Sequence, residues 1–538
     1  MKQMKPKILT ALRGYTKEQF LKDLISGIIV AIIALPLSIA FAIGAGVSAE
    51  KGIYAAIISS IVCALLGGSR VQISGPTGAF IVITQTVIMQ YGTEGLAVAM
   101  LIAGVMLMAM GIFRLGKLIR FIPAPITTGF TAGIGVTIFT LEVKDFLGLE
   151  IAEMPTKFFD KWAVYFINLQ NVNYQAILLG LLCIVILVIW PKVNKTIPNS
   201  LIAIVVGTVL VQVMKLDVKL LGDIPKALGA PKLYFVDVQT FIDLISPGFT
   251  IAILIAMQAL LSAVVTDGMI NSRTNSSAEL FAQGLANIVL GIFGCIPATG
   301  GVARGVQSAK NGARTPIAAI VHSVCLFLFL VLLMPLIRLV PLCVLAAILI
   351  VVSYNMLNVK VLLGYLKAPK SDLIVLVISC VLTFAFDLVF AIEVGMVLSA
   401  GLFMKRMSDV TNVSAWKEVP DESRYDIDFK VVPKGTAVYE ITGPLFFGAA
   451  DVLKKIVVDE HKKCLIIRMR SVGTIDATAL NYLDVLYEDC KNKEVQLILS
   501  HANEQPLMAM KKAGFFDKVG EENFCPNIDA ALKRAAQL

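Results

Sequence analysis

The sequence predicts an all-α polytopic membrane domain of fourteen transmembrane segments in a 7+7 inverted repeat, followed by a small α/β domain. Three observations lead to this fold class. Hydrophobic residues make up 57% of the 538 residues and charged residues only 16%, whereas soluble domains carry about 25% charge. Charged residues are sparse over 24–406 and reach ordinary globular density over 410–538. Two interrupted apolar segments with related sequences also recur at a fixed interval.

The membrane domain is expected to occupy residues 24–406, after a basic, amphipathic cytoplasmic leader at 1–23 that lacks a signal-peptide cleavage site. A spanning helix needs about 20 apolar residues. Two interrupted segments follow Gly75 and Gly300, and the other twelve begin near Leu24, Gly52, Leu96, Pro123, Gln175, Asn199, Phe249, Glu279, Thr315, Val340, Asp372 and Leu388.

Lysine and arginine gather in alternate connections between these segments, as the positive-inside rule requires. This pattern predicts a multi-pass protein of the inner (plasma) membrane with both termini in the cytoplasm. The net charge of +9 has the same origin. Because no basic stripe is interleaved with aromatic residues, nucleic acid is not an expected partner.

The inverted repeat rests on two related stretches, ISGPTGAF (73–80) and CIPATGGVAR (295–304). Their prolines, Pro76 and Pro297, lie 221 residues apart, and the first helices of the two halves are separated by almost the same interval. Repeat one covers about 24–213 and repeat two about 249–406. Seven spans reverse the direction of the chain, so the halves must be inverted.

These Pro–Gly breaks are the predicted binding site. Proline lacks an N–H and glycine tolerates most backbone angles, and irregular backbone at membrane depth must be buried in protein or line a wet cavity. Short helices should begin near Thr77 and Gly301, with free N–H groups facing a shared gap. Such termini bind anions. The alternative is that both breaks are kinks that help helices pack.

Arg304 lies one turn into the second short helix, within apolar sequence. A charge at the bilayer centre is costly, so the side chain either adds positive potential to an anion cavity, snorkels, or pairs with Glu279 or Glu393. Gln258 and Ser262 share a helix face, and the interval of 221 residues places Leu37 at the point equivalent to Gln258. Gln258 therefore faces the cavity or forms an interhelical hydrogen bond.

No enzyme, metal site or cofactor is expected. The nine cysteines stand singly, the three histidines cannot complete a metal cluster, and no nucleophile–base set or phosphate loop is visible. Residues 410–538 alternate strand-like and helix-like stretches, with strands expected within 438–450, 463–476 and 495–502 and a helix over 477–493. This alternation predicts a small α/β domain.

The stretches GGSRVQISGPTGAF (67–80), LLSAVVTDGM (260–269), ELFAQGLAN (279–287) and IPATGGVAR…GARTP (296–316) resemble the SulP family. This family contains bacterial sulfate, bicarbonate and dicarboxylate transporters and the animal anion exchangers, including prestin. The tail resembles a STAS domain. The resemblance implies a mobile core domain, a gate domain that forms a homodimer, and an anion that contacts Leu37, Thr77, Gly78, Ala79, Phe80, Gly301, Val302, Ala303 and Arg304.

The chain departs from the family at Gln258. Members that couple transport to a cation usually carry an acid there, so Gln258 and Ser262 mark a possible cation-coupling position at which Na⁺ or H⁺ coupling is in doubt. In the tail, Ala477 follows Asp476 where signalling relatives of the STAS fold carry a phosphorylated serine, so that switch cannot operate through Ala477. A cytoplasmic protein partner at this domain remains open.

The expected function is secondary-active or facilitative transport of a small inorganic anion (bicarbonate, chloride or sulfate) by elevator-like alternating access. The alternatives are a C4-dicarboxylate transporter and an uncoupled anion channel or motor. A nucleobase permease is disfavoured by Arg304 and by the STAS-like tail.

Overall fold

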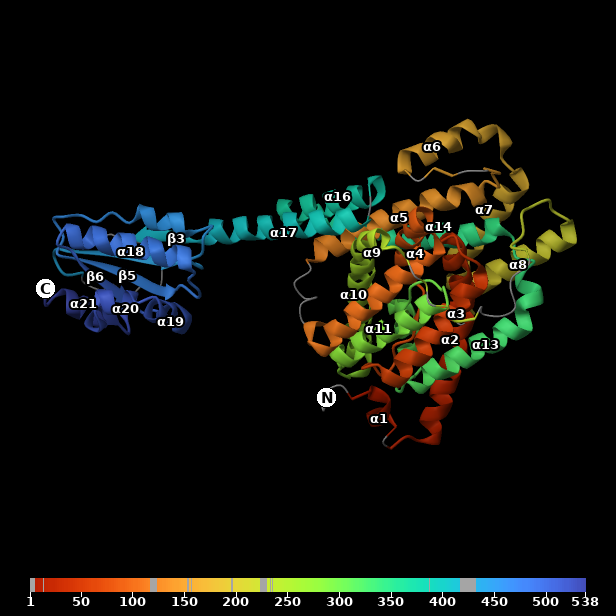
Figure 1. The fold of residues 1–538 in the computed structure, drawn as a ribbon, viewed down its shortest axis with the longest axis horizontal. Helices are drawn as coiled ribbons and strands as arrows, with labels where there is room; N and C mark the ends of the chain where they lie inside the picture. The colour runs from red at the N-terminus through yellow and green to blue at the C-terminus, as the bar shows by residue number, and fades with distance from the viewer. Residues whose placement is uncertain are drawn as a thin grey trace. The chain divides into compact units, whose positions relative to one another are not determined.

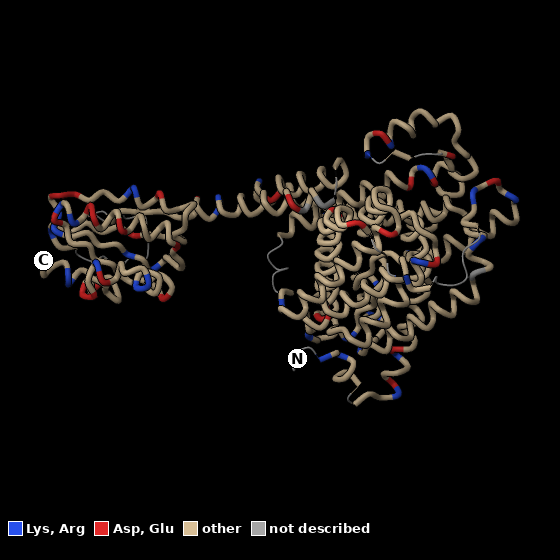
Figure 2. Tube along the Cα trace, in the orientation of Figure 1, with Lys and Arg blue, Asp and Glu red and all other residues tan. Residues whose placement is uncertain are grey.

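The computed structural model describes residues 5–12, 14–116, 123–151, 154–155, 157–194, 197–222, 230–232, 234, 236–386, 388–416 and 432–538. The chain divides into two compact units, Met1–Val397 and Leu398–Leu538, which are described separately. In the first unit charged residues lie mostly at helix ends and in connections, whereas both signs of charge are spread over the second (Figure 2).

The first unit is helical (Figure 1). Its first half contains α1 (Lys7–Ala11), α2 (Lys17–Gly44), α3 (Ala49–Leu66), β1 (Ser74–Gly75), α4 (Ala79–Ile112), α5 (Ala124–Phe146), α6 (Phe158–Ile167), α7 (Tyr174–Val193) and α8 (Asn199–Met214). Its second half contains α9 (Val238–Asp243), α10 (Ile245–Ile270), α11 (Ser276–Ile292), β2 (Thr299–Gly300), α12 (Val302–Lys310), α13 (Ile317–Ile337), α14 (Leu342–Leu357), α15 (Val359–Tyr365), α16 (Lys370–Ala385) and the first part of α17 (Leu388–Val410), whose last part belongs to the second unit.

Every predicted transmembrane segment falls on one of these helices. The third and fourth segments are continuous in α4 and meet at Gly92, whose φ of 71° is non-helical. Among the described residues, seven helices are long and apolar enough to cross a membrane, and α8 and α13 are shorter apolar helices. The first helix begins at Lys17 rather than Leu24, because the Thr16 side chain accepts a hydrogen bond from the Gln19 N–H and caps it.

The helices pack as two bundles. In one, α11 lies against both α3 and α4, and α10, α12, α13 and α2 pack around them. In the other, α5 packs against α14 and α16, with α7 and α8 beside α14. Glycines permit these close approaches: a Cβ on Gly133 would lie 2.7 Å from the Cys380 carbonyl oxygen, and one on Gly284 2.6 Å from that of Gly104.

The second unit is a small α/β domain, as predicted. Its five-stranded sheet has the order β3 (Asn412–Ala415), β4 (Thr436–Thr442), β5 (Cys464–Ser471), β6 (Gln496–Ser500), β7 (Phe524–Cys525). Only the β3–β4 pair is antiparallel. The helices are α18 (Ala477–Asn492), α19 (Glu504–Lys512), α20 (Phe515–Val519) and α21 (Ile528–Ala535), and Ala450–Lys455 forms a 3₁₀ turn, η3. The strands β3 and β7 and the helices α19–α21 were not anticipated from sequence.

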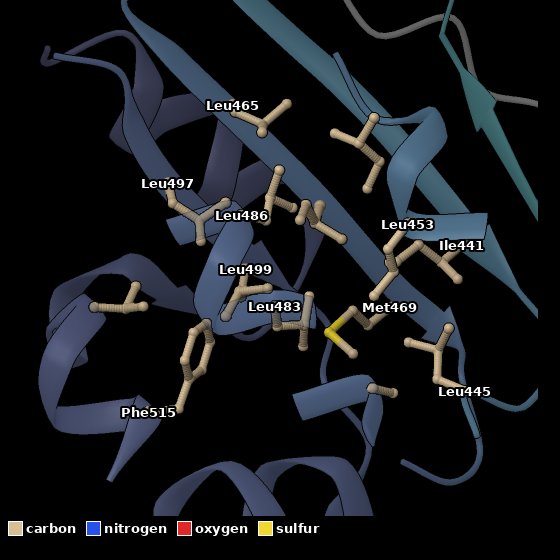
Figure 3. Close-up of a cluster of buried hydrophobic side chains, with 14 of the residues drawn as sticks. Ile441, Leu445, Leu453, Leu465, Met469, Leu483, Leu486, Leu497, Leu499 and Phe515 are labelled. Atoms are coloured by element: carbon tan, nitrogen blue, oxygen red, sulfur yellow. The ribbon is translucent and has the colours of Figure 1, made fainter. Parts of the chain in front are cut away.

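Apolar side chains cover both faces of this sheet. On one face, Leu483 and Leu486 of α18 pack on Leu497 and Leu499 of β6, beside Phe515 of α20 (Figure 3). On the other face, α21 packs against alternate residues of the same strands, including Ile466 and Ile498. The alternation follows from the two-residue period of a strand, and each face is buried by its own helices.

Candidate functional site

The two interrupted segments meet in the first unit. β1 pairs with β2 in antiparallel register, with Ser74 opposite Gly300 and Gly75 opposite Thr299. The Gly301 N–H extends the pairing by donating to the Ile73 carbonyl at 3.3 Å. Segments more than 200 residues apart are thus neighbours, and the antiparallel pairing is the orientation expected of inverted halves.

A helix begins within four residues of the end of each strand, at Ala79 and at Val302, and leaves unpaired amides at its first turn. Gly78 is the N-cap of α4 and Gly301 that of α12. Within the part of the chain that the structure describes, the N–H groups of Ala79, Val302 and Ala303 have no hydrogen-bond acceptor. Free amides and the positive ends of two helix dipoles therefore lie on either side of one two-residue ladder.

Arg304 links the two helix starts. Its side chain is only 7% exposed, and its guanidinium donates to the carbonyl oxygens of Pro76 and, at 3.5 Å, Ser74. It lies directly on Gly75, where a Cβ would come within 1.7 Å of Nη1. Glycine at position 75 is thus required for the guanidinium to reach the backbone of the opposite half.

The buried arginine has no carboxylate counter-ion among the described residues. Glu279 is occupied by the N–H groups of Gly68 and Ser69, and Glu393 is exposed on α17. The structure thus shows neither the predicted alternative of an ion pair with these acids nor snorkelling to an aqueous surface. Instead, Arg304 satisfies carbonyls that the break in the helix leaves free.

Gln258 of α10 also reaches the break. The Thr77 hydroxyl donates to the Gln258 Oε1 at 2.9 Å, and both residues are partly exposed. Ser262, one turn further along α10, is fully buried, and its hydroxyl has no hydrogen-bond partner within the described part of the chain. This hydroxyl faces Gly305 of α12, where a Cβ would lie 3.4 Å from the Ser262 Oγ. The helix α10 therefore contacts both short helix starts.

The other predicted site residues differ in exposure. Ala303 is exposed and Val302 and Thr77 are partly exposed, whereas Gly78, Ala79, Phe80 and Gly301 are buried. Gly78 lies under side chains of α2, α5 and α14, with the Met356 sulfur 3.4 Å from its ideal Cβ. Leu37 of α2 is partly buried against a cluster formed by α7, α8 and α14, so it lies where the two bundles meet.

Gln72 was missed by the sequence reasoning, although it stands in the quoted stretch 67–80. It is 6% exposed, and both polar atoms of its amide lack partners among the described residues. A Cβ on Gly300 would lie 1.4 Å from its Nε2. The signal available in the sequence was a polar residue two positions before the broken strand, within apolar surroundings.

Comparisons with known proteins agree with this architecture. The profile of the Sulfate permease family matches residues 20–379, and that of the STAS domain matches residues 430–531. YvdB of Bacillus subtilis, described as a candidate sulfate transporter, is 36% identical over 96% of this chain and 98% of its own length. The bicarbonate transporter BicA of Picosynechococcus is 28% identical over 95% of this chain and 94% of its own length.

Solved structures show the same fold. Murine Slc26a9, an anion transporter captured in an inward-facing state, superposes with a TM-score of 0.90 at 20% identity and covers 99% of this chain and 94% of its own. The transmembrane domain of a cyanobacterial BicA superposes with a TM-score of 0.64 at 25% identity over 72% of this chain and 99% of its own. The membrane domain and the tail therefore both have structural counterparts.

Proposed function

The chain belongs to the Sulfate permease family and contains a STAS domain, and we propose that it transports small inorganic anions across the membrane, binding each anion between the N-termini of α4 and α12. Members of this family are multi-pass membrane anion transporters rather than enzymes. The proposed substrates are bicarbonate, chloride and sulfate, and the alternative substrate is a C4-dicarboxylate.

One observation carries the proposal: a buried guanidinium, which has no carboxylate partner among the residues that the structure describes, lies between two helix starts whose first amides have no acceptor there. An uncompensated charge in a low-dielectric interior is unfavourable. A bound anion supplies the missing negative charge and accepts hydrogen bonds from the free N–H groups. The same arrangement gives a neutral nucleobase no comparable advantage.

The substrate is proposed to be small because the site offers separate hydrogen-bond donors rather than several arginine side chains that each bind through two N–H groups. The guanidinium of Arg304 already donates to two backbone carbonyls, so it acts mainly through its positive potential. A large polyanion requires several bidentate clamps. Backbone amides and the Nε2 of Gln258 suit one compact anion.

Transport is proposed to follow alternating access, with the bundle of α2–α4 and α10–α13 moving past the bundle of α5–α8 and α14–α17. Gly78 and Leu37 lie against the second bundle, so this movement changes what covers the site. We further propose that the second bundle forms a homodimer contact and that both termini are cytoplasmic in the plasma membrane.

Gln258 favours uncoupled transport or anion exchange. A neutral amide cannot supply the charge that binds Na⁺ or exchanges H⁺, and its Oε1 already accepts the Thr77 hydroxyl. The Nε2 of Gln258 remains as a donor suited to an anion.

Purified protein in proteoliposomes tests the proposal. Uptake of labelled bicarbonate, chloride and sulfate is measured with and without Na⁺ and a pH gradient, in competition with a C4-dicarboxylate and a nucleobase. The proposal predicts saturable uptake of at least one inorganic anion that is independent of Na⁺. Uptake of the nucleobase alone contradicts it, and strong Na⁺ dependence contradicts the assignment of Gln258.

A further inference from the structure

We propose that three polar residues on successive turns of α11, Glu279, Gln283 and Asn287, position both broken segments and thereby aim the two helix N-termini at the anion. We call these residues the α11 ladder. The inference rests on the proposed function, because it concerns the same site. None of the three needs to touch the anion, so they are positioning residues.

Glu279 holds the connection that leads into β1. Its side chain is 1% exposed, and its Oε2 accepts hydrogen bonds from the N–H groups of Gly68 at 2.9 Å and Ser69 at 3.1 Å. The connection also lies directly on the start of α11, because a Cβ on Gly68 would come within 2.0 Å of the Asn275 carbonyl oxygen. Charge-assisted bonds of this kind are stronger than neutral ones.

Gln283 holds β1 itself. Its side chain is fully buried, and its Nε2 donates to the Ser74 hydroxyl at 2.9 Å and to the Glu279 Oε1 at 3.0 Å. From the opposite side, the Ser60 hydroxyl of α3 donates to the Ser74 carbonyl oxygen at 2.7 Å. The first residue of β1 is thus fixed between α11 and α3.

Asn287 holds the residue before β2. Its Nδ2 donates to the Ala298 carbonyl oxygen at 2.8 Å, and its Oδ1 accepts from the Ala298 N–H at 3.0 Å. A side-chain amide matches a backbone peptide group in this way, so one asparagine fixes both the position and the rotation of the segment. Asn287 is also fully buried.

The α11 ladder therefore contacts both halves of the repeat from one rigid element. Glu279 and Asn287 are eight residues apart, which corresponds to about 12 Å along a helix that rises about 1.5 Å per residue. This length sets the spacing between the start of one break and the start of the other. Burying three polar side chains is unfavourable unless each is hydrogen-bonded, and each of these reaches a break.

The test compares anion uptake by the intact protein with that of two variants. Gln283→Met keeps the shape of the side chain but cannot donate to Ser74, and Asn287→Ala removes the paired bonds to Ala298. Ser59→Ala is the matched control, because Ser59 is fully buried and its hydroxyl donates only to Ala55 of its own helix at 2.6 Å. Each preparation is checked for thermal unfolding.

Misaligned helix starts weaken anion binding, so the KM of uptake should rise at least tenfold in both variants while the maximum rate per folded protein changes less than twofold. A merely structural role would instead lower the amount of folded transporter and leave the KM unchanged. Glu279→Gln, which keeps an acceptor oxygen, should retain a KM nearer that of the parent than Glu279→Ala does.

The outcomes separate this inference from the proposed function. If the parent protein does not transport small anions, the proposed function fails. If the parent and Ser59→Ala transport with the same KM as Gln283→Met and Asn287→Ala, the inference is overturned while the function stands. Should Asn287→Ala fail to fold, the KM of Gln283→Met and the comparison of the two Glu279 variants decide the matter.

Discussion

Replacing Gln258 by glutamate tests whether α10 faces the bound anion. The Thr77 Oγ1 lies 2.9 Å from the Gln258 Oε1, and an anion bound to the first amides of α4 adds one further hydrogen-bond length of about 3 Å. A carboxylate at this position would therefore lie about 6 Å from the anion. At an effective dielectric constant of about 20, two like charges at about 6 Å repel by about 3 kcal/mol.

Gln258→Glu should thus weaken apparent anion affinity by a factor of about 100 at neutral pH. The effect should diminish as the pH falls, because an introduced carboxyl with an ordinary pKa of about 4.3 becomes neutral on protonation. Uptake as a function of anion concentration, measured between pH 5 and 8, gives both the loss of apparent affinity at neutral pH and its dependence on pH.

Gln307→Glu is the matched control, since it makes the same chemical change on α12 at a side chain that bonds Asn311 at the far end of that helix. It should change the affinity far less. An unchanged KM in Gln258→Glu at neutral pH would refute the placement of Gln258 beside the anion.

Three further predictions follow from the same structure. Arg304→Ala should raise the KM for anion uptake about 10–100-fold, because a unit positive charge about 6–12 Å from the anion contributes about 1.4–2.8 kcal/mol at an effective dielectric constant of about 20; unchanged affinity would remove Arg304 from the site. Gly75→Ala should weaken uptake by displacing the guanidinium, which would lie 1.7 Å from the new Cβ, whereas Gly364→Ala, with nothing within 4 Å, should behave like the parent in the same assay. In the STAS domain, burial raises the pKa of Cys490 to about 12, so mass spectrometry should find this thiol unalkylated by maleimide at pH 7.5 until the domain unfolds, and rapid labelling of folded protein would contradict that burial.

The position of the two breaks was predictable because they carry a strong local pattern. Proline and glycine within apolar sequence mark an interruption wherever they occur, and their recurrence at one interval identified two matching places. The inversion predicted that the two breaks face one gap, whereas the pairing of Ser74 with Gly300 was not predicted. Helix starts were located to within two residues, at Ala79 and Val302.

The contacts of Arg304 were not predictable in the same way. Besides a role in the anion cavity, sequence reasoning offered a carboxylate partner or snorkelling, because these are the usual solutions for a buried cation. The actual partners are backbone carbonyls of the other half. Every residue type has a backbone carbonyl, so the sequence does not show which carbonyls accept these hydrogen bonds. Gln72 was not predicted for a related reason, because its place at the site depends on its contact with Gly300 across the β1–β2 pair.

In the tail, too, some elements were predictable from the sequence and others were not. The buried strands β5 and β6 each contain a short apolar run, 464–467 and 497–499, and the helix predicted over 477–493 corresponds to α18 (Ala477–Asn492). The two-residue strand β7 is too short to leave a periodic pattern, and β3 follows directly from a long helix. Both depend on pairing with neighbours for their conformation.

The most direct test of the central claim is the location of the anion itself. A structure of the protein soaked in bromide or selenate, recorded at an X-ray wavelength where the anion scatters anomalously, would reveal its position. If the two helix starts form the binding site, a peak should lie within hydrogen-bonding distance of the first amides of α4 and α12, beside Thr77 and Arg304. A fully occupied peak elsewhere in the membrane domain, with none between these two helix starts, would contradict it.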